Sequence, residues 1–281
     1  MIIQHNMTAA NTSRQLGITT GNLAKSSEKL SSGYRINRAG DDAAGLSISE
    51  KMRGQIRGLE QGSTNAQDGI SLIQTAEGAL NETHSIIQRM RELTVQAAND
   101  TNETEDRDAI AKELNQLQSE VTRIGSQTEF NKKKLLDGST SALNFQVGAN
   151  NGQSISVTLQ SMKATDLGKA SAGSTVTLAN AASNVGSYGA ATAYLDVLDK
   201  ALNDVSTFRS DLGSVQNRLE HTIANADNTS ENLQAAESRI RDVNMADEMV
   251  KFSKNNILQQ AAQSMLAQAN QSTQGILSVI G

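Results

Sequence analysis

The side chains best suited to metal or phosphate chemistry lie in residues 36–58, which read INRAGDDAAGLSISEKMRGQIRG. Asp41, Asp42 and Glu50 carry carboxylate oxygens, the ligands that hard cations prefer. The aspartate pair lacks the spacing of an EF-hand calcium loop, however, and Glu50 is the only close supporting carboxylate. Aspartates also cap helices by accepting hydrogen bonds from the first free N–H groups. We therefore expect Asp41 and Asp42 to cap a helix that begins near Ala43 rather than to bind a metal.

The other motifs point away from an enzyme. His5, His84 and His221 lie far apart without the HExxH spacing of zinc enzymes, and no Walker-type phosphate loop is present. Because the chain has no cysteine, it can form no disulfide and no thiolate metal site. The net charge of −5 and the lack of a basic stripe give no reason to expect nucleic acid. We expect no catalytic residue and no cofactor.

Two further classes of segment are missing from the sequence. No run approaches the ~20 apolar residues that a membrane helix needs, so we expect no membrane insertion. The first residues, MIIQHNMTAANTS, lack the basic and long apolar regions of a secretory signal peptide. If the chain leaves the cell, we expect it to be exported without a cleaved signal peptide.

The absence of proline and a heptad periodicity together indicate long helices. Proline costs about 3 kcal/mol in a helix interior, and none occurs in 281 residues. Apolar residues that recur every seven positions are typical of helices packed side by side. We predict a mainly α fold, a long coiled-coil-like helical bundle. The repeating positions are Met52, Leu59, Ala66, Ile73, Leu80 and Ile87, then Ile110, Leu114, Leu117, Val121 and Ile124, then Leu198, Val205, Leu212, Leu219, Ala226, Leu233 and Ile240.

The middle of the chain changes pattern. Apolar and polar residues alternate within residues 143–160 around the turn sequence GANNGQ, which predicts a small β-hairpin. An isolated hairpin is only marginally stable, so we expect it to lie against the bundle. Residues 164–192 are rich in Ala, Ser, Thr, Gly and Asn and show little periodicity. We expect them to form a variable surface connection.

The two ends carry thin apolar seams. No charged side chain occurs from Asn255 to Gly281. A fully buried leucine contributes about 1.5–3 kcal/mol, whereas ordering the backbone costs about 1–2 kcal/mol per residue. We therefore expect ends that are largely disordered in the monomer and fold when packed among many copies. The expected assembly positions are Leu16, Leu23, Leu30, Leu258, Met265, Leu266 and Ile276.

These patterns predict a nested layout. Residues 1–44 and 237–281 form one terminal helical layer. Residues 45–163, with the hairpin, and 193–236 form an inner layer, and 164–192 lie at its outer tip.

Three motifs in order resemble bacterial flagellin, the subunit of the flagellar filament. They are EKLSSGYRINRAGDDAAGLSISEKMRGQIRG at 28–58, QTEFNKKKLLDG at 127–138 and ILSVIG at 276–281. The resemblance covers essentially the whole chain, as a short form without the large central outer domains of many flagellins. It implies a filament-core domain of paired N- and C-terminal helices, and an extracellular helical homopolymer used for motility.

The resemblance also implies partners. Family members are exported by the flagellar type III route, and an export chaperone binds their C-terminal helices, here roughly residues 245–281. Filament cap and hook-associated proteins meet the growing polymer. Some flagellins are recognised by host Toll-like receptor 5, and the matching residues here are Arg89, Leu93 and Glu113. The alternative is that Arg89 belongs to a solvated face and Leu93 to a subunit contact.

The terminal layer ends and the inner layer begins near residues 40–45. We expect an inter-domain joint there, formed by Gly40, Asp41, Asp42 and Gly45. Two rival functions stay open. A hook–filament junction protein would share the ends of a flagellin but cap the polymer. A secreted metal-dependent enzyme would use Asp41, Asp42 and Glu50.

Overall fold

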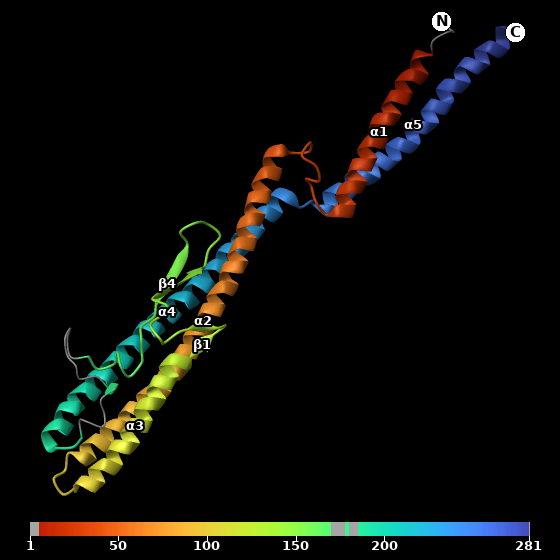
Figure 1. Cartoon of the computed structure of the whole chain (residues 1–281). Coiled ribbons are helices and arrows are strands. Elements are labelled where there is room, and N and C mark those ends of the chain that lie inside the picture. The colour runs from red at the N-terminus through yellow and green to blue at the C-terminus, as the bar shows by residue number, and fades with distance from the viewer. Residues whose placement is uncertain (1–5, 170–177, 180–184, 281) are drawn as a thin grey trace. The chain divides into compact units, whose positions relative to one another are not determined.

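The computed structural model describes residues 6–169, 178–179 and 185–280, with side chains as far as residue 272 (Figure 1). Long helices dominate it, so the mainly α prediction is confirmed. The elements in chain order are α1 (Met7–Ser32), α2 (Ala43–Ala97), α3 (Thr104–Gln127), β1 (Glu129–Phe130), β2 (Lys133–Lys134), β3 (Ala142–Gln146), β4 (Ser154–Thr158), α4 (Tyr188–Arg241) and α5 (Met245–Ile280).

The chain divides into two compact units. The terminal unit comprises Met1–Ile56 and Glu231–Gly281, and the inner unit comprises Arg57–Ser230. Helices α2 and α4 contribute residues to both units. The two chain ends thus form one unit and the central segment another, as in the predicted nested layout. The domain limits drawn from the sequence stay predictions.

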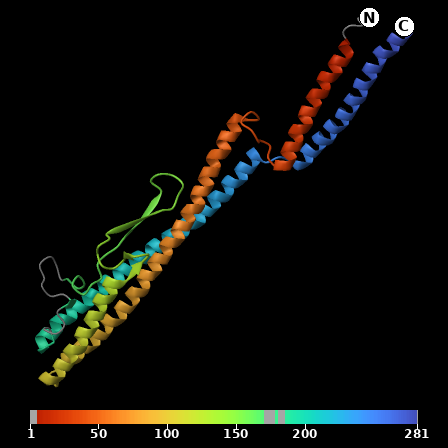
Figure 2. The same cartoon turned by 45° about the vertical axis from the view of Figure 1, so that its right-hand side comes forward.

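The inner unit is built on the predicted heptads. Both views show α2, α3 and α4 running side by side there (Figures 1 and 2). At the seam positions Ala66, Ile73, Leu80 and Ile87 of α2 the exposed fraction of the side chain is 1% or less. The matching positions of α3 and α4 are buried as well, namely Ile110, Leu114, Val121, Leu198, Val205, Leu212, Leu219 and Ala226. The coiled-coil-like packing is confirmed.

The predicted hairpin is also present and lies against the bundle. Strands β3 and β4 pair antiparallel, with Leu143 opposite Val157 and Phe145 opposite Ile155. These four side chains face the core because alternate residues of a strand point to one side. Val147, which directly follows β3, lies against α2. The contact is so close that a Cβ atom added at Gly62 would lie 2.6 Å from the carbonyl oxygen of Val147.

A second, shorter hairpin was not predicted. Strands β1 and β2 pair antiparallel, and the two residues that connect them, Asn131 and Lys132, have φ angles of 48° and 64°. Two consecutive left-handed residues are typical of a tight hairpin turn whose second position favours glycine. Lysine at that position hid the turn in the sequence.

The surface connection predicted for residues 164–192 is wrong at six described positions. The buried residues are Ala164, Leu167, Gly168, Leu178, Val185 and Ala191. The hydroxyl of Tyr194 donates a hydrogen bond of 3.0 Å to the carbonyl oxygen of Leu178. Burial raises the pKa of that hydroxyl. The aliphatic anchors are too widely spaced to show a period. Residues 188–192 of the predicted segment belong to α4, and residues 170–177 and 180–184 lie outside the described residues.

Candidate assembly site

Helices α1 and α5 pair along the terminal unit, which confirms the predicted pairing of the chain ends (Figure 1). They run antiparallel, since the amide of Asn6, just before α1, donates a hydrogen bond of 3.0 Å to the carbonyl oxygen of Ala269 in α5. At the other end, the N–H of Val243, just before α5, donates one of 3.0 Å to the carbonyl oxygen of Gly33, just after α1. The seam of α1 alternates buried Thr19 and Ser26 with the half-buried predicted positions Leu16, Leu23 and Leu30. The prediction that these ends are disordered in the free monomer concerns another state and stays a prediction.

The predicted α5 positions separate into two sets. Leu266 is half-buried and Ala269 is 8% exposed, so both lie toward α1. Leu258 and Met265 are 45% and 60% exposed and do not take part in the pairing. Ile276 lies beyond the described side chains. Because the helix from Asn255 onward is uncharged, the sequence offered no charged residues to show which apolar stripe meets α1.

The exposed set continues along one side of α5. Val250, Ile257, Leu258 and Met265 follow each other at spacings of seven, one and seven, which places them on one helix face. Their exposed fractions range from 45% for Leu258 to 69% for Val250. We name these four residues the α5 apolar face. Lys254 lies on the same face between Val250 and Leu258, so the uninterrupted part of the α5 apolar face runs from Ile257 to Met265. Exposed apolar surface of this kind indicates a protein interaction site.

The loop before α2 contains the aspartate pair. The carboxylate of Asp42 accepts a hydrogen bond of 2.9 Å from the backbone N–H of Gly45, so its predicted role as a helix cap is confirmed. The same prediction for Asp41 is wrong, because its carboxylate accepts hydrogen bonds from the backbone N–H groups of Arg38, at 3.1 Å, and Asn37, at 3.2 Å. These bonds lower the pKa of Asp41. Asp41 thus holds the loop before α2 together and does not cap the helix.

Gly45 is required for close packing, since an added Cβ would lie 2.5 Å from a carboxylate oxygen of Asp42 and 2.9 Å from the end of buried Ile36. Gly40 has no neighbour within 4 Å of such an atom. In the described part of the chain, His, Asp and Glu side chains form no group of three that could hold a metal ion. The joint role of residues 40–45 stays a prediction.

Sequence reasoning missed the pairing of the two segments that connect to α1 and α5. The N–H of Arg35 donates to the carbonyl oxygen of Arg241, at 2.7 Å, and the N–H of Val243 donates to that of Gly33, at 3.0 Å. The guanidinium of Arg241 also lies 4.8 Å from the centre of the Tyr34 ring. Two residues per segment are too few for a strand pattern, so the sequence carried no signal for this contact.

The residues of the predicted receptor surface lie on α2 and α3 of the inner unit. Arg89 forms ion pairs of 3.1 Å with both Glu92 and Glu113, and its pKa is raised by hydrogen bonds to these carboxylates. The side chains of Arg89 and Glu113 are about half exposed, at 52% and 48%. Leu93 is only 2% exposed. It packs in the core, so the suggestion that it forms a surface contact does not fit its position.

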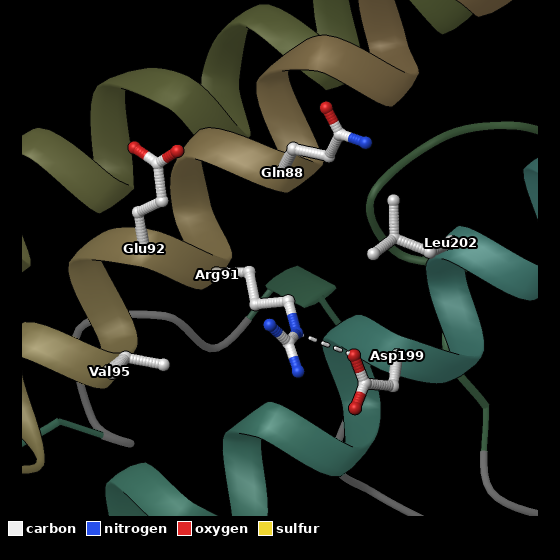
Figure 3. Close-up of a pocket in the computed structure, with 6 residues that line it drawn as sticks. All are labelled: Gln88, Arg91, Glu92, Val95, Asp199 and Leu202. Carbon is white, nitrogen blue, oxygen red and sulfur yellow. Dashed lines mark hydrogen bonds and ion pairs between the residues drawn. The ribbon is translucent and has the colours of Figure 1, made fainter.

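A shallow groove of about 680 Å³ runs between α2 and α4. Figure 3 shows Arg91 of α2 reaching across it to Asp199 of α4, at 2.8 Å. Exposed Val95 and half-buried Leu202 line the groove together with Gln88 and Glu92. The ion pair crosses the groove and joins the two helices.

Comparison with known proteins gives the family. Residues 3–141 match the bacterial flagellin N-terminal helical region, and residues 195–280 match the bacterial flagellin C-terminal helical region. The flagellin of Halalkalibacterium halodurans is 56% identical over 280 residues, and that of Bacillus subtilis is 53% identical over 304 residues. In both cases the alignment covers 100% of this chain and of the relative.

The fold has a counterpart among solved structures. A structure titled as a putative flagellar hook-associated protein from Vibrio parahaemolyticus aligns with a TM-score of 0.62 at 13% identity, covering 72% of this chain and 100% of that one. Identity at this level shows a shared fold alone. None of the helices within the described residues has the length and apolar character that crossing a membrane requires. From the two family matches and the full-length relatives, the chain belongs to the bacterial flagellin family and is a structural subunit of the flagellar filament.

Proposed function

We propose that the chain polymerises through the α5 apolar face, which packs against the paired α1 and α5 helices of neighbouring copies. The observation that carries this proposal is the exposure of Val250, Ile257, Leu258 and Met265 on a helix that has no charge from Asn255 onward. One face meeting a different face extends without closing, as a helical filament requires. Leu16, Leu23, Leu30 and Leu266 then support assembly indirectly by holding the pair together.

Seeded polymerisation tests the proposal. The intact chain is expected to elongate filament fragments, measured by sedimentation and negative-stain microscopy. A chain lacking residues 255–281 is expected not to elongate them, because it lacks most of the α5 apolar face. Its inner unit should keep its helical circular dichroism, since residues 57–230 form a compact unit with their own core. Elongation by the shortened chain would contradict the proposal.

The remaining partners follow from family membership and are proposals for this chain. An export chaperone would cover the C-terminal helices before assembly, and the cap and hook-associated proteins would meet the two ends of the polymer. Export would proceed by the flagellar type III route into the extracellular filament. A hook–filament junction protein is the rival function. Quantitative mass spectrometry of cells decides between them. A filament subunit is present in thousands of copies, whereas a junction protein is present only in the few copies that form a ring.

We also propose that Toll-like receptor 5 recognises the exposed ion pair of Arg89 and Glu113, with Leu93 as its packing support. Arg89→Ala is expected to weaken receptor binding about tenfold, as is typical when one partner of a charged contact is removed. Arg91→Ala is the matched control, because Arg91 pairs instead with Asp199 in the α2–α4 groove. Binding measured with the purified receptor ectodomain should fall for the first variant only. Equal binding by both would contradict the proposal.

A further inference from the structure

The sulfur atoms of this chain are unevenly distributed between core and surface. The chain has eight methionines and no cysteine. Met90 and Met162 of the inner unit are 0% and 2% exposed, whereas Met249 and Met265 of α5 are 50% and 60% exposed. A reagent in solution that attacks thioether sulfur therefore reaches the terminal unit before it reaches the inner core. The other two exposed methionines among the described residues, Met7 and Met245, also belong to the terminal unit.

Met265 carries the only sulfur of the α5 apolar face, since the other members are valine, isoleucine and leucine. It lies in the uninterrupted part of that face, which begins at Ile257. Met249 precedes Met265 by sixteen residues, which is about 160° around the helix at about 3.6 residues per turn. Met249 is thus an exposed methionine on the same helix but on a different side. The pair allows oxidation on the face to be compared with oxidation away from it.

Hydrogen peroxide converts methionine to methionine sulfoxide by transfer of one oxygen atom. A lone pair of the thioether sulfur attacks one peroxide oxygen, so that an S–O bond forms and the O–O bond breaks. The hydrogen on the transferred oxygen passes to the departing hydroxide, which leaves as water. Sulfur is oxidised and the peroxide is reduced. A flexible apolar side chain thereby becomes a polar one whose oxygen accepts hydrogen bonds.

We propose that Met265 is an oxidation site at which a peroxide weakens the assembly of the free subunit. The proposal rests on the proposed function, because the sulfoxide matters only if neighbouring copies cover the α5 apolar face. In the free chain the sulfoxide oxygen stays in water. In the polymer it would lie among apolar side chains without a donor, which raises the critical concentration for elongation about tenfold. Methionine sulfoxide reductases, one for each epimer, remove the oxygen and restore the apolar surface.

Peptide mass spectrometry of the peroxide-treated free chain locates the oxidation. Met265 sulfoxide is expected at doses that leave Met90 and Met162 unmodified. The helical circular dichroism should stay unchanged, because changes at exposed positions perturb the fold little. Sulfoxide formation at Met90 and Met162 as fast as at Met265 would overturn the inference, because the loss of assembly would then follow from general damage.

Met265→Leu tests the role of this sulfur, because leucine keeps the apolar volume and cannot be oxidised by peroxide. The variant should elongate seeds as the parent does, before and after peroxide treatment. The treated parent should need a concentration about tenfold higher. Met249→Leu is the matched control, which keeps Met265 and should be as sensitive to peroxide as the parent. Treatment of the oxidised parent with both reductases should restore elongation.

Equal loss of elongation by oxidised Met265→Leu and by the oxidised parent would overturn the inference. Normal elongation by a parent whose Met265 is fully converted to sulfoxide would do the same. Met265→Glu distinguishes this result from failure of the proposed function. If that variant does not elongate while the Met265 sulfoxide elongates normally, only the oxidation site is wrong. If both elongate normally, neighbouring copies do not cover the α5 apolar face, and the proposed function fails as well.

Discussion

Replacing Gly62 by alanine is expected to lower the free energy of unfolding of the inner unit by about 2 kcal/mol. The new Cβ would lie 2.6 Å from the carbonyl oxygen and 2.7 Å from the carbonyl carbon of Val147, both of them backbone atoms. Val147 cannot easily withdraw, because its N–H bonds the carbonyl oxygen of Gln153 at 3.0 Å and its side chain is 8% exposed. Asn65 also holds the hairpin to α2 through a bond of 2.9 Å to the carbonyl oxygen of Gln146. The overlap must therefore move a strand end.

Gly78→Ala is the matched control for this prediction. Gly78 lies in the same helix and unit, and an added Cβ would have no neighbour within 4 Å. Alanine is favoured over glycine in a helix by about 1 kcal/mol, so this variant should be slightly more stable than the unchanged chain. Urea unfolding followed by circular dichroism, with tyrosine fluorescence as a second signal, measures both. A Gly62→Ala variant as stable as Gly78→Ala would show that the hairpin does not rest on α2.

The features that the sequence predicted well are those with a regular period. Ile73 and Leu80 on α2 and Leu198 and Val205 on α4 are all fully buried, because a heptad repeat in a chain without proline leaves few alternatives to packed helices. The alternation within 143–160 identified the larger hairpin for the same reason. Periodic burial leaves a pattern that can be read along the chain without knowledge of what the segment packs against.

The features that the sequence missed depend on contacts without a period. Leu167 and Leu178 anchor an otherwise small-residue segment, but two aliphatic residues eleven positions apart form no pattern. Asp41 and Asp42 are adjacent and chemically identical, and only the path of the loop decides which one caps the helix. Glu248 looks like an ordinary surface acid until α1 covers it.

For α5, the sequence indicated the region involved but not which of its residues face α1 and which face outward. Its uncharged run indicated assembly, yet Met265 and Leu266 could not be told apart because they are adjacent and both apolar. In the structure Leu266 is half-buried on the side of α1, whereas Met265 is 60% exposed. A charge at either position should block polymerisation, but by different routes. At Leu266 it would separate α1 from α5, and at Met265 it would leave the pair intact.

Met265→Glu is therefore expected to abolish seeded elongation while leaving the monomer unchanged. Substitutions at exposed positions usually alter stability by no more than about 0.5 kcal/mol, so the helical circular dichroism and the urea midpoint of the free chain should match those of the parent. In a filament the same carboxylate would lose its water without gaining a partner. A penalty of about 3 kcal/mol for that burial corresponds to a roughly 100-fold higher critical concentration.

Gln263→Glu adds the same charge to the same helix at an exposed position away from the α5 apolar face. It should elongate seeds at a critical concentration within a few-fold of the parent, because its carboxylate would stay in water. Sedimentation across a range of protein concentrations gives the critical concentration of both variants. A large rise for Met265→Glu and not for Gln263→Glu would show that the position of the charge matters, rather than its presence. Equal behaviour would mean that neighbouring copies do not cover the α5 apolar face, and a different surface would have to carry assembly.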